Sequence, residues 1–220
     1  MIFVNFKTFE PGTGDKALAL IKIIESVAQT SGVKIIPVVQ ASDLKEATLS
    51  SKLEIWTQKV DPVTYGAHTG SILPEAVLED GAIGTFLNHS EAKIGDFNIL
   101  KETVDKAKAV GLKTLVFAGD EKELARVLTL APSFASYEPP ELVGSRDVSV
   151  SKAHPDIISK ASELCKEAGI PLIVGAGIHS RDDIKKSLEL GAVGVALATD
   201  VVLAKDPRVE LIDLVQGFSG

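Results

Sequence analysis

Short apolar runs alternate with longer amphipathic segments along the whole chain. The apolar runs are nearly continuous, which is typical of buried parallel strands covered by helices. They predict strands over residues 2–5, 34–38, 55–59, 85–88, 115–118, 134–137, 172–175 and 194–197. The amphipathic segments predict helices over about 15–29, 43–49, 74–79, 98–110, 122–130, 155–168 and 181–190, and a last segment that ends near Val215.

Residues at the ends of the predicted helices support this division. Three pairs have the spacing of a capping box, in which a side chain caps the first turn: Asp43 with Glu46, Asp120 with Glu123, and Ser180 with Asp183. Three glycines stand where a helix C-terminus needs a left-handed residue: Gly111, Gly169 and Gly191. The boundaries therefore follow from local chemistry as well as from periodicity.

Eight strand-helix units in 220 residues predict an α/β fold, a single (β/α)8 barrel domain over residues 1–220 with eight parallel strands and an outer ring of helices. A doubly wound open sheet uses similar units and is the alternative. No Ser/Gly/Pro-rich or highly charged linker interrupts the alternation, which argues against a second domain.

Composition narrows the classes of function. The net charge of -7, without a basic face, argues against nucleic acid as a partner. No uncharged run approaches the roughly 18 residues of a membrane span. The N-terminus has no signal-peptide pattern, so we expect no membrane partner and a cytoplasmic location. Cys165 is the single cysteine and is expected to be a buried apolar residue.

Polar residues follow three of the predicted strands. Asn5 and Lys7 end the first strand, His89 ends the fourth, and Glu138 ends the sixth, where Pro139 and Pro140 stiffen the chain. Taken singly, each is an ordinary surface or turn residue. In a barrel, however, the carboxyl ends of all strands meet at one mouth. A base, a proton donor and a fixed cation there are the set needed to move a proton beside a carbonyl.

At these residues the sequence resembles the triosephosphate isomerase family, and specifically its short archaeal type. Segments 5–7, 87–91 and 137–144 resemble the family's three catalytic segments, in order and on the corresponding strands, and 175–178 resembles its seventh-loop phosphate site. The resemblance spans the whole chain. It implies an isomerase of glycolysis and gluconeogenesis that interconverts dihydroxyacetone phosphate and glyceraldehyde 3-phosphate, with no cofactor and no metal.

The resemblance also implies roles for individual residues. Glu138 would move the proton between two carbons through an enediolate, and His89 would polarise the carbonyl. Lys7 would stabilise the developing negative charge, Asn5 would hold a substrate oxygen, and Glu91 would anchor Lys7. The phosphate would be bound by Val143, Gly144 and Ser145 of the closing loop, Gly175 and Gly177 of the seventh loop, and Ala198 and Thr199 of the eighth.

Several features depart from the family pattern. The closing loop is one residue longer over 144–153 and lacks the second glycine, and Asp200 stands where glycine is usual. Asp200 must point away from a phosphate, or affinity suffers. His179 is expected on the surface and His154 at a helix start. Residues 175–180 also half-match a dinucleotide fingerprint, but the third glycine is missing.

Residues 65–73 resemble the loop that inserts into a neighbouring subunit in this family. Thr69 would then support the partner's Lys7, which implies a homo-oligomer, either a dimer or a tetramer. The alternative is an ordinary glycine-rich surface turn.

Two other functions remain open from the sequence. One is a Schiff-base aldolase that uses Lys7 as its nucleophile, which borohydride trapping would reveal. The other is a noncatalytic sensor that binds a phosphorylated metabolite without turning it over.

Overall fold

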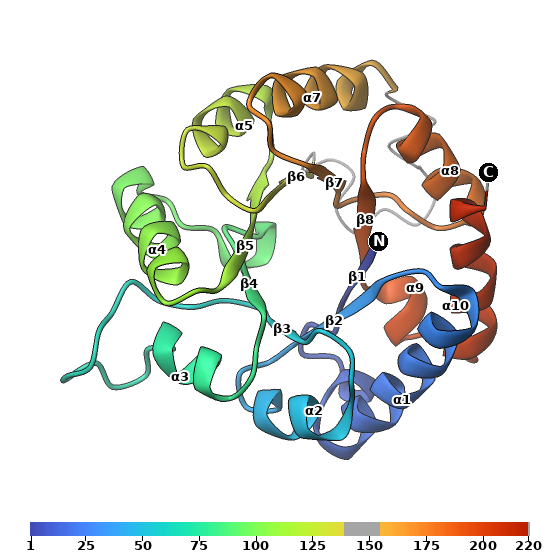
Figure 1. Cartoon of the computed structure of the whole chain (residues 1–220), viewed down its shortest axis with the longest axis horizontal. Helices are drawn as coiled ribbons and strands as arrows, with labels where there is room; N and C mark the ends of the chain where they lie inside the picture. Colours follow the sequence, from blue (N-terminus) through green and yellow to red (C-terminus); the bar gives the residue numbers. More distant parts are fainter. Residues whose placement is uncertain (139–154, 220) are drawn as a thin grey trace.

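The computed structural model describes residues 1–138 and 155–219. Eight parallel strands close into a barrel surrounded by helices (Figure 1). The strands are β1 Ile2–Asn5, β2 Ile35–Val39, β3 Trp56–Thr57, β4 Gly84–Leu87, β5 Lys113–Ala118, β6 Phe134–Tyr137, β7 Leu172–Val174 and β8 Gly194–Leu197. β1 pairs with β8, Ile2 opposite Val195, so the sheet has no edge and the open-sheet alternative is wrong.

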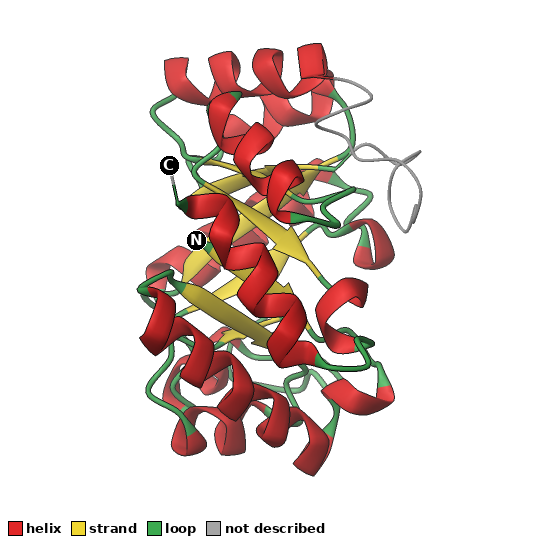
Figure 2. Ribbon diagram, turned by 90° about the vertical axis from the view of Figure 1, so that its right-hand side faces the viewer, coloured by secondary structure: helices red, strands yellow, loops and turns green. Residues whose placement is uncertain are grey.

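The helices follow the strands in sequence and lie outside them, as Figure 2 shows from the side. They are α1 Gly14–Ser31, α2 Leu44–Ser50, α3 Pro74–Glu79, α4 Phe97–Ala109, α5 Glu121–Leu128, α7 Pro155–Glu167, α8 Arg181–Glu189, α9 Thr199–Val202 and α10 Pro207–Val215. Short 3-10 helices cover η1 Glu10–Gly12, η2 Ser90–Ala92 and η4 Gln216–Phe218. The (β/α)8 barrel predicted from the sequence is confirmed.

Two elements differ from the sequence prediction. β3 is shorter than residues 55–59, because only Trp56 and Thr57 find partners on both β2 and β4. The last predicted segment is split into α9 and α10. Asp206 caps α10 through the backbone N–H groups of Arg208 and Val209, and Pro207 cannot continue a preceding helix because it lacks an N–H.

The predicted helix ends are mostly confirmed. Asp120 and Ser180 each accept a hydrogen bond from the backbone N–H three residues later. Asp43 also precedes a helix, but its side chain makes no capping bond, so the box predicted there is wrong. Its backbone is already helical, at φ -100° and ψ -6°, whereas a capping residue needs an extended backbone. Gly111, Gly169 and Gly191 all have positive φ.

Aromatic side chains fill the interior of the barrel. Phe3 packs edge-on against Trp56, with ring centroids 5.0 Å apart, and Phe86 packs in the same way against Phe117 at 4.9 Å. Phe134 joins them from β6. The interior is therefore a packed core rather than a pore, so a ligand cannot bind inside the barrel.

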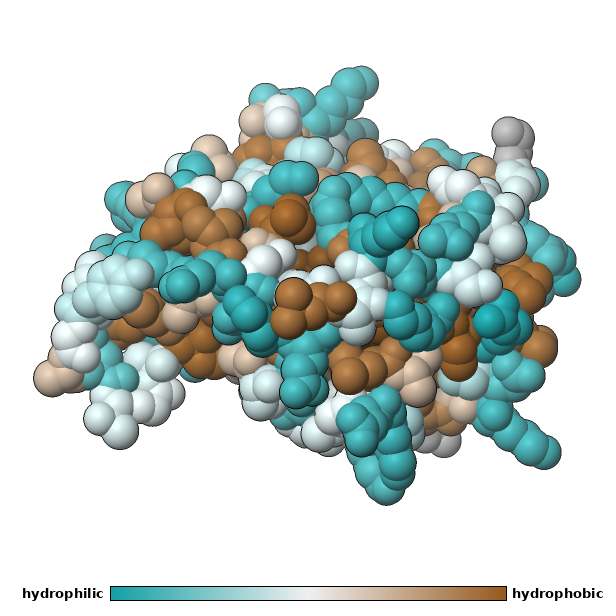
Figure 3. Space-filling model, turned by 60° about the horizontal axis from the view of Figure 1, so that its bottom comes forward, coloured by the Kyte–Doolittle hydropathy of each residue, from teal (hydrophilic) through white to brown (hydrophobic). Residues whose placement is uncertain are grey.

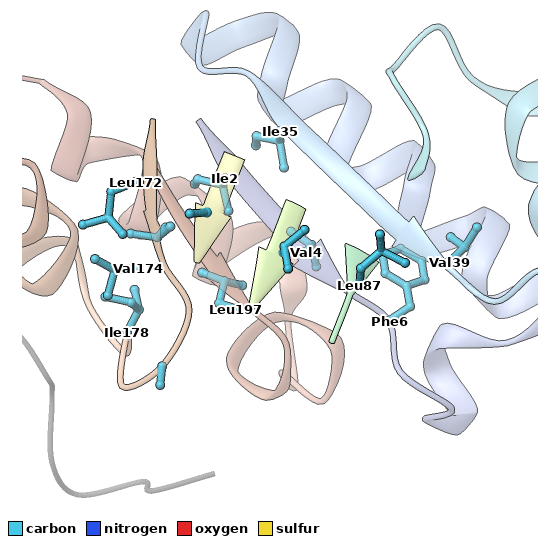
Figure 4. Packing of buried hydrophobic residues seen from close by; sticks show 14 of the residues in the cluster. Ile2, Val4, Phe6, Ile35, Val39, Leu87, Leu172, Val174, Ile178 and Leu197 are labelled. Carbon is cyan, nitrogen blue, oxygen red and sulfur yellow. The ribbon is translucent and has the colours of Figure 1, made fainter. Parts of the chain in front are cut away.

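A larger apolar layer lies between the strands and the helices. The members labelled in Figure 4 come from β1, β2, β4, β7, β8 and the segments beside them. Cys165 belongs to this layer and is buried as predicted, and burial raises the pKa of its thiol to about 11. On the face shown in Figure 3, apolar residues form separate patches among polar ones. No helix within the described residues is long and apolar enough to cross a membrane.

Candidate active site

The carboxyl ends of the strands enclose a small cavity of about 50 Å³. Side chains two residues apart point to the same side of a strand. Asn5 therefore lies above Phe3, and Glu138 above Phe134, on the interior side. The lining comprises Asn5, Lys7, Phe86, His89, Phe117, Glu138, Gly175, Ala196, Leu197 and Ala198. Four residues singled out as catalytic, Asn5, Lys7, His89 and Glu138, thus share one cavity.

Lys7 is held in an uncommon backbone conformation, with φ +48°. Its N–H donates to Oδ1 of Asn5 at 3.0 Å, and its carbonyl accepts from Nε2 of Gln58 at 2.8 Å. These two bonds stabilise a left-handed turn that a lysine adopts only at a cost. Because Oδ1 of Asn5 is engaged, the amide nitrogen of Asn5 is the group left to donate to a ligand.

The ammonium of Lys7 forms an ion pair with Glu91. Nζ lies 2.6 Å from Oε1, and the Lys7 side chain is 19% exposed while that of Glu91 is 55% exposed. Glu91 therefore holds the cation at the rim of the cavity, in the anchoring position expected from the sequence. Such a fixed positive charge can stabilise an anion that forms in the cavity.

Asn88 fixes the exit of β4, immediately before His89. Its backbone has φ +60°, and its amide nitrogen donates both to the Phe117 carbonyl and to Oε1 of Glu123, each at 2.8 Å. Oδ1 of Asn88 accepts from the Ile94 N–H at 2.9 Å. Both polar atoms of the Asn88 side chain are therefore hydrogen-bonded in a buried setting. These bonds fix the backbone immediately before His89 and so define the position of His89.

A hydrogen bond to His89 shows which ring nitrogen carries the proton. Nδ1 accepts from the Glu91 backbone N–H at 3.1 Å, so in the neutral ring the proton is on Nε2. The pKa of His89 is lowered to about 4, mainly by burial. The charge of Glu91 raises this pKa, and the charges of Lys7 and Lys93 lower it. His89 is therefore neutral at pH 7. Its Nε2–H lies 3.8 Å from Oε1 of Glu138 and is available to donate to a ligand.

Glu138 is the buried carboxyl of the site, with 6% of its surface exposed. Burial raises its pKa to about 7, while Ser90, through its side chain and backbone, and the charge of Lys7 act in the opposite direction. A carboxyl whose pKa is near the working pH is well suited to take up and return a proton. Oε2 of Glu138 has no hydrogen-bond partner among the described residues.

Gly175 leaves space for the Glu138 carboxyl. A Cβ placed on Gly175 would lie 2.5 Å from Oγ of Ser136 and 3.4 Å from Oε1 of Glu138. The end of β7 can therefore approach the end of β6 this closely only with glycine. Gly177 follows with φ +64°, which lets the seventh loop turn.

The predicted phosphate loops contribute unequally to the cavity. Gly175 and Ala198 line it, whereas Gly177 and Thr199 are not part of its lining. His179 was expected on the surface, but its side chain is only 25% exposed and Nδ1 lies 3.0 Å from Oδ2 of Asp200. Asp200 is thus turned toward the seventh loop.

The remaining predicted residues lie elsewhere. Val143, Gly144, Ser145 and His154 fall outside the described residues. Thr69 is exposed in the connection from β3 to α3, which projects beyond the ring of helices (Figure 1, teal) and does not reach this chain's own cavity.

The sequence reasoning missed three supporting residues: Gln58, Asn88 and Ser90. Asn88 and Ser90 stand within the recognised segment beside His89, so their place at a strand end was a signal that we did not use. Gln58 gave no such signal, because its bond to Lys7 joins positions 51 residues apart. Within 1–138 and 155–219, no group of three or more His, Cys, Asp or Glu is arranged to hold a metal.

A larger groove, of about 640 Å³, lies between the C-terminal ends of α7 and α8, next to the starts of β7 and β8. It is at the opposite end of the barrel and contains none of the residues above. In barrels of this kind the chemistry takes place at the carboxyl ends of the strands, so the smaller cavity is the better candidate despite its size.

Comparison with known proteins identifies a family. A family model described as triosephosphate isomerase matches residues 1–217. A triosephosphate isomerase from Methanobacterium bryantii is 40% identical over 98% of this chain and 95% of its own length. One from Saccharolobus solfataricus is 41% identical over 98% and 94%, and one from Methanothermus fervidus is 39% identical over 98% and 97%.

Proposed function

The chain belongs to the triosephosphate isomerase family, and from this premise we propose that it interconverts dihydroxyacetone phosphate and D-glyceraldehyde 3-phosphate with Glu138 as the base. The observation that carries the proposal is the pairing of two neighbouring groups with complementary proton states. Glu138 is a carboxyl with a raised pKa, and His89 is a neutral donor whose Nε2 lies 3.8 Å from it.

The proton transfer proceeds through an enediolate intermediate. The Glu138 carboxylate removes a proton from C1 of dihydroxyacetone phosphate, and the electron pair of the C–H bond moves to form an enediolate. The Nε2–H of His89 and the ammonium of Lys7 stabilise the negative oxygen. Protons then redistribute between the two oxygens, and Glu138 returns its proton to C2 to give the aldehyde.

Asn5 and the two phosphate loops orient the substrate in this proposal. The amide nitrogen of Asn5 donates to a substrate oxygen, because its Oδ1 is engaged by Lys7. Phosphate is bound by backbone groups around Gly175, Gly177, Ala198 and Thr199, together with Val143, Gly144 and Ser145. No metal or cofactor takes part.

The quaternary structure and location follow from the family as proposals. The loop over 65–73 would dock on a second copy, with Thr69 beside the partner's Lys7, in a dimer or tetramer. We place the protein in the cytoplasm, where the reaction serves glycolysis and gluconeogenesis.

The Schiff-base alternative is less well supported. A nucleophilic lysine must lose its proton and offer a lone pair. The Nζ of Lys7 is already bonded to Oε1 of Glu91 at 2.6 Å, so it is not free to attack a carbonyl.

A coupled enzyme assay on the purified protein tests the proposal directly. We expect turnover of both triose phosphates at neutral pH without added metal. Glu138→Ala should lose nearly all turnover while still binding a phosphorylated inhibitor. An inactive wild-type protein that binds the inhibitor tightly would indicate the sensor instead, and a borohydride-trapped adduct would indicate the aldolase.

A further inference from the structure

His179 and Asp200 connect the loops that follow β7 and β8. Nδ1 of His179 lies 3.0 Å from Oδ2 of Asp200. Since a carboxylate can only accept a hydrogen bond, Nδ1 carries the proton and donates it. The other ring nitrogen, Nε2, is buried and has no partner in the described parts of the chain. Asp200 is therefore the one described residue that the imidazole binds.

The backbone of His179 is fixed independently of this contact. Its N–H donates to Oδ2 of Asp183 at 3.2 Å, and the Ser180 hydroxyl donates to the same oxygen at 2.8 Å. Asp183 is buried in the first turn of α8. His179 is thus a rigid point on the seventh loop from which its ring reaches across to the eighth.

Asp200 brings a negative charge close to the cavity. It stands two residues after Ala198, which lines the cavity beside Glu138. Burial raises the pKa of Glu210, and the charges of Asp200 and Asp213 raise it further, so the charge of Asp200 acts on its surroundings. Residues 175–180 and 198–200 include no lysine or arginine, and His179 is their one basic side chain.

We propose that His179 is a positioning residue that makes Asp200 compatible with a bound phosphate. It holds the carboxylate against the seventh loop and prevents it from turning toward the anion. The inference rests on the proposed function, because a phosphorylated substrate is what would place an anion between these loops. Without His179, the freed carboxylate would repel that anion.

The variant His179→Ala tests this role. The affinity for 2-phosphoglycolate, a phosphorylated acid that resembles the enediolate, should fall about three- to tenfold, as expected when a partly exposed carboxylate loses its partner near an anion. KM should rise by the same factor and kcat should change little, because substrate and transition state carry the same phosphate.

Matched variants separate this role from general support of the loop. Asp200→Asn should bind the inhibitor at least as tightly as wild type, and His179→Ala should then have almost no further effect in that background. His179→Asn, which keeps a donor near the Nδ1 position, should recover most of the affinity. Thermal unfolding of each variant shows whether it is folded.

The outcomes distinguish this inference from the proposed function. If His179→Ala weakens binding equally in the wild-type and Asp200→Asn backgrounds, or does not weaken it, the positioning role is wrong while the isomerase assignment stands. If folded wild-type protein neither binds 2-phosphoglycolate nor turns over triose phosphates, both are wrong.

Discussion

Burial moves the pKa values of the two central residues in opposite directions. The pKa of Glu138 is raised to about 7 and that of His89 is lowered to about 4, and burial is the largest cause of both shifts. Burial disfavours the charged form of each, which for a carboxyl is the deprotonated form and for an imidazole the protonated one. At pH 7 the histidine is therefore neutral, and the carboxyl titrates close to the working pH.

The first prediction concerns the pH dependence of turnover. kcat/KM should fall below about pH 7, because protonated Glu138 cannot act as a base, whereas His89 stays neutral down to about pH 4. The phosphate of the substrate also titrates, near pH 6. Ser90→Ala separates the two, because Ser90 lowers the pKa of Glu138. In that variant the acid limb should move to higher pH, and an unmoved limb would argue against Glu138.

The sequence could indicate the reacting residues but not how they are held. Asn5, Lys7, His89 and Glu138 were found because each stands just after an apolar run, and the barrel places all such positions together. The Lys7 backbone is also held by Gln58, and the turn before His89 is held by the bonds of Asn88 to Phe117 and Glu123. Such contacts depend on the register of distant strands, which a single sequence does not specify.

At the scale of elements, the approach of β6 and β7 decides the space around the base. Ser136 and Glu138 lie on the interior side of β6 and its extension, and Gly175 continues β7 beside them. The Oγ of Ser136 is buried and has no partner among the described residues. The first group to collide with a side chain at 175 is this hydroxyl.

The second prediction uses that contact. Gly175→Ala should lower kcat by about ten- to a hundredfold, because its Cβ would lie 2.5 Å from Ser136 Oγ and 3.4 Å from Glu138 Oε1, and small displacements of a catalytic group are costly. Adding Ser136→Ala removes the closest atom and should restore much of the activity. Ser136→Ala alone serves as the control. If the double variant is no better than Gly175→Ala, the clash is not the cause.

The predicted elements fail where neighbours rather than local sequence decide. β3 is limited to two residues by its pairing with the strands beside it, although the sequence predicted a strand over residues 55–59. The Asp43 capping box has the right residue types, but the chain entering α2 is already helical there. Periodicity thus predicts that an element exists, while tertiary pairing sets its ends.

At the scale of the whole molecule, the loop over 65–73 is a preformed projection. Its base is held by Asp61, which bonds Ile72 through both backbone and side chain, and by Lys106, which donates to the Pro62 carbonyl. Residues 64–71 are exposed, and Tyr65 is 73% exposed. An exposed tip on an ordered base leaves these residues free to meet a second copy, as the proposed docking requires.

The third prediction tests that role. Thr69→Asp should weaken self-association and make activity per subunit fall on dilution. In the proposed dimer it buries a carboxylate beside the partner's Lys7, whose ammonium is already paired with a glutamate, so the two carboxylates repel each other. Sedimentation velocity over a range of concentrations measures the association. Thr30→Asp, on the exposed end of α1, is the matched control. Unchanged association in Thr69→Asp would mean that this loop is not part of a subunit interface.

The last prediction concerns how the buried Glu138 carboxyl changes the stability of the folded protein with pH. Glu138 has a pKa of about 7 in the folded protein and an ordinary value of 4.5. Between these pH values the folded state binds more protons than the unfolded state, so Glu138 makes stability fall as pH rises. His89 acts in the opposite direction between about pH 4 and 6.5, so it offsets the contribution of Glu138 where the two windows overlap.

Glu138→Gln removes one side of this balance. At pH 4 both proteins carry a neutral group at position 138 and should be equally stable. At pH 8 the variant should be more stable by about 2–3 kcal/mol, since a pKa shift of one unit corresponds to roughly 1.4 kcal/mol. Urea unfolding at each pH measures the difference, with Glu79→Gln on the exposed side of α3 as control. A difference that does not grow with pH would mean that the pKa of Glu138 is not raised in the folded protein. The raised pKa would then no longer support Glu138 as the proposed base.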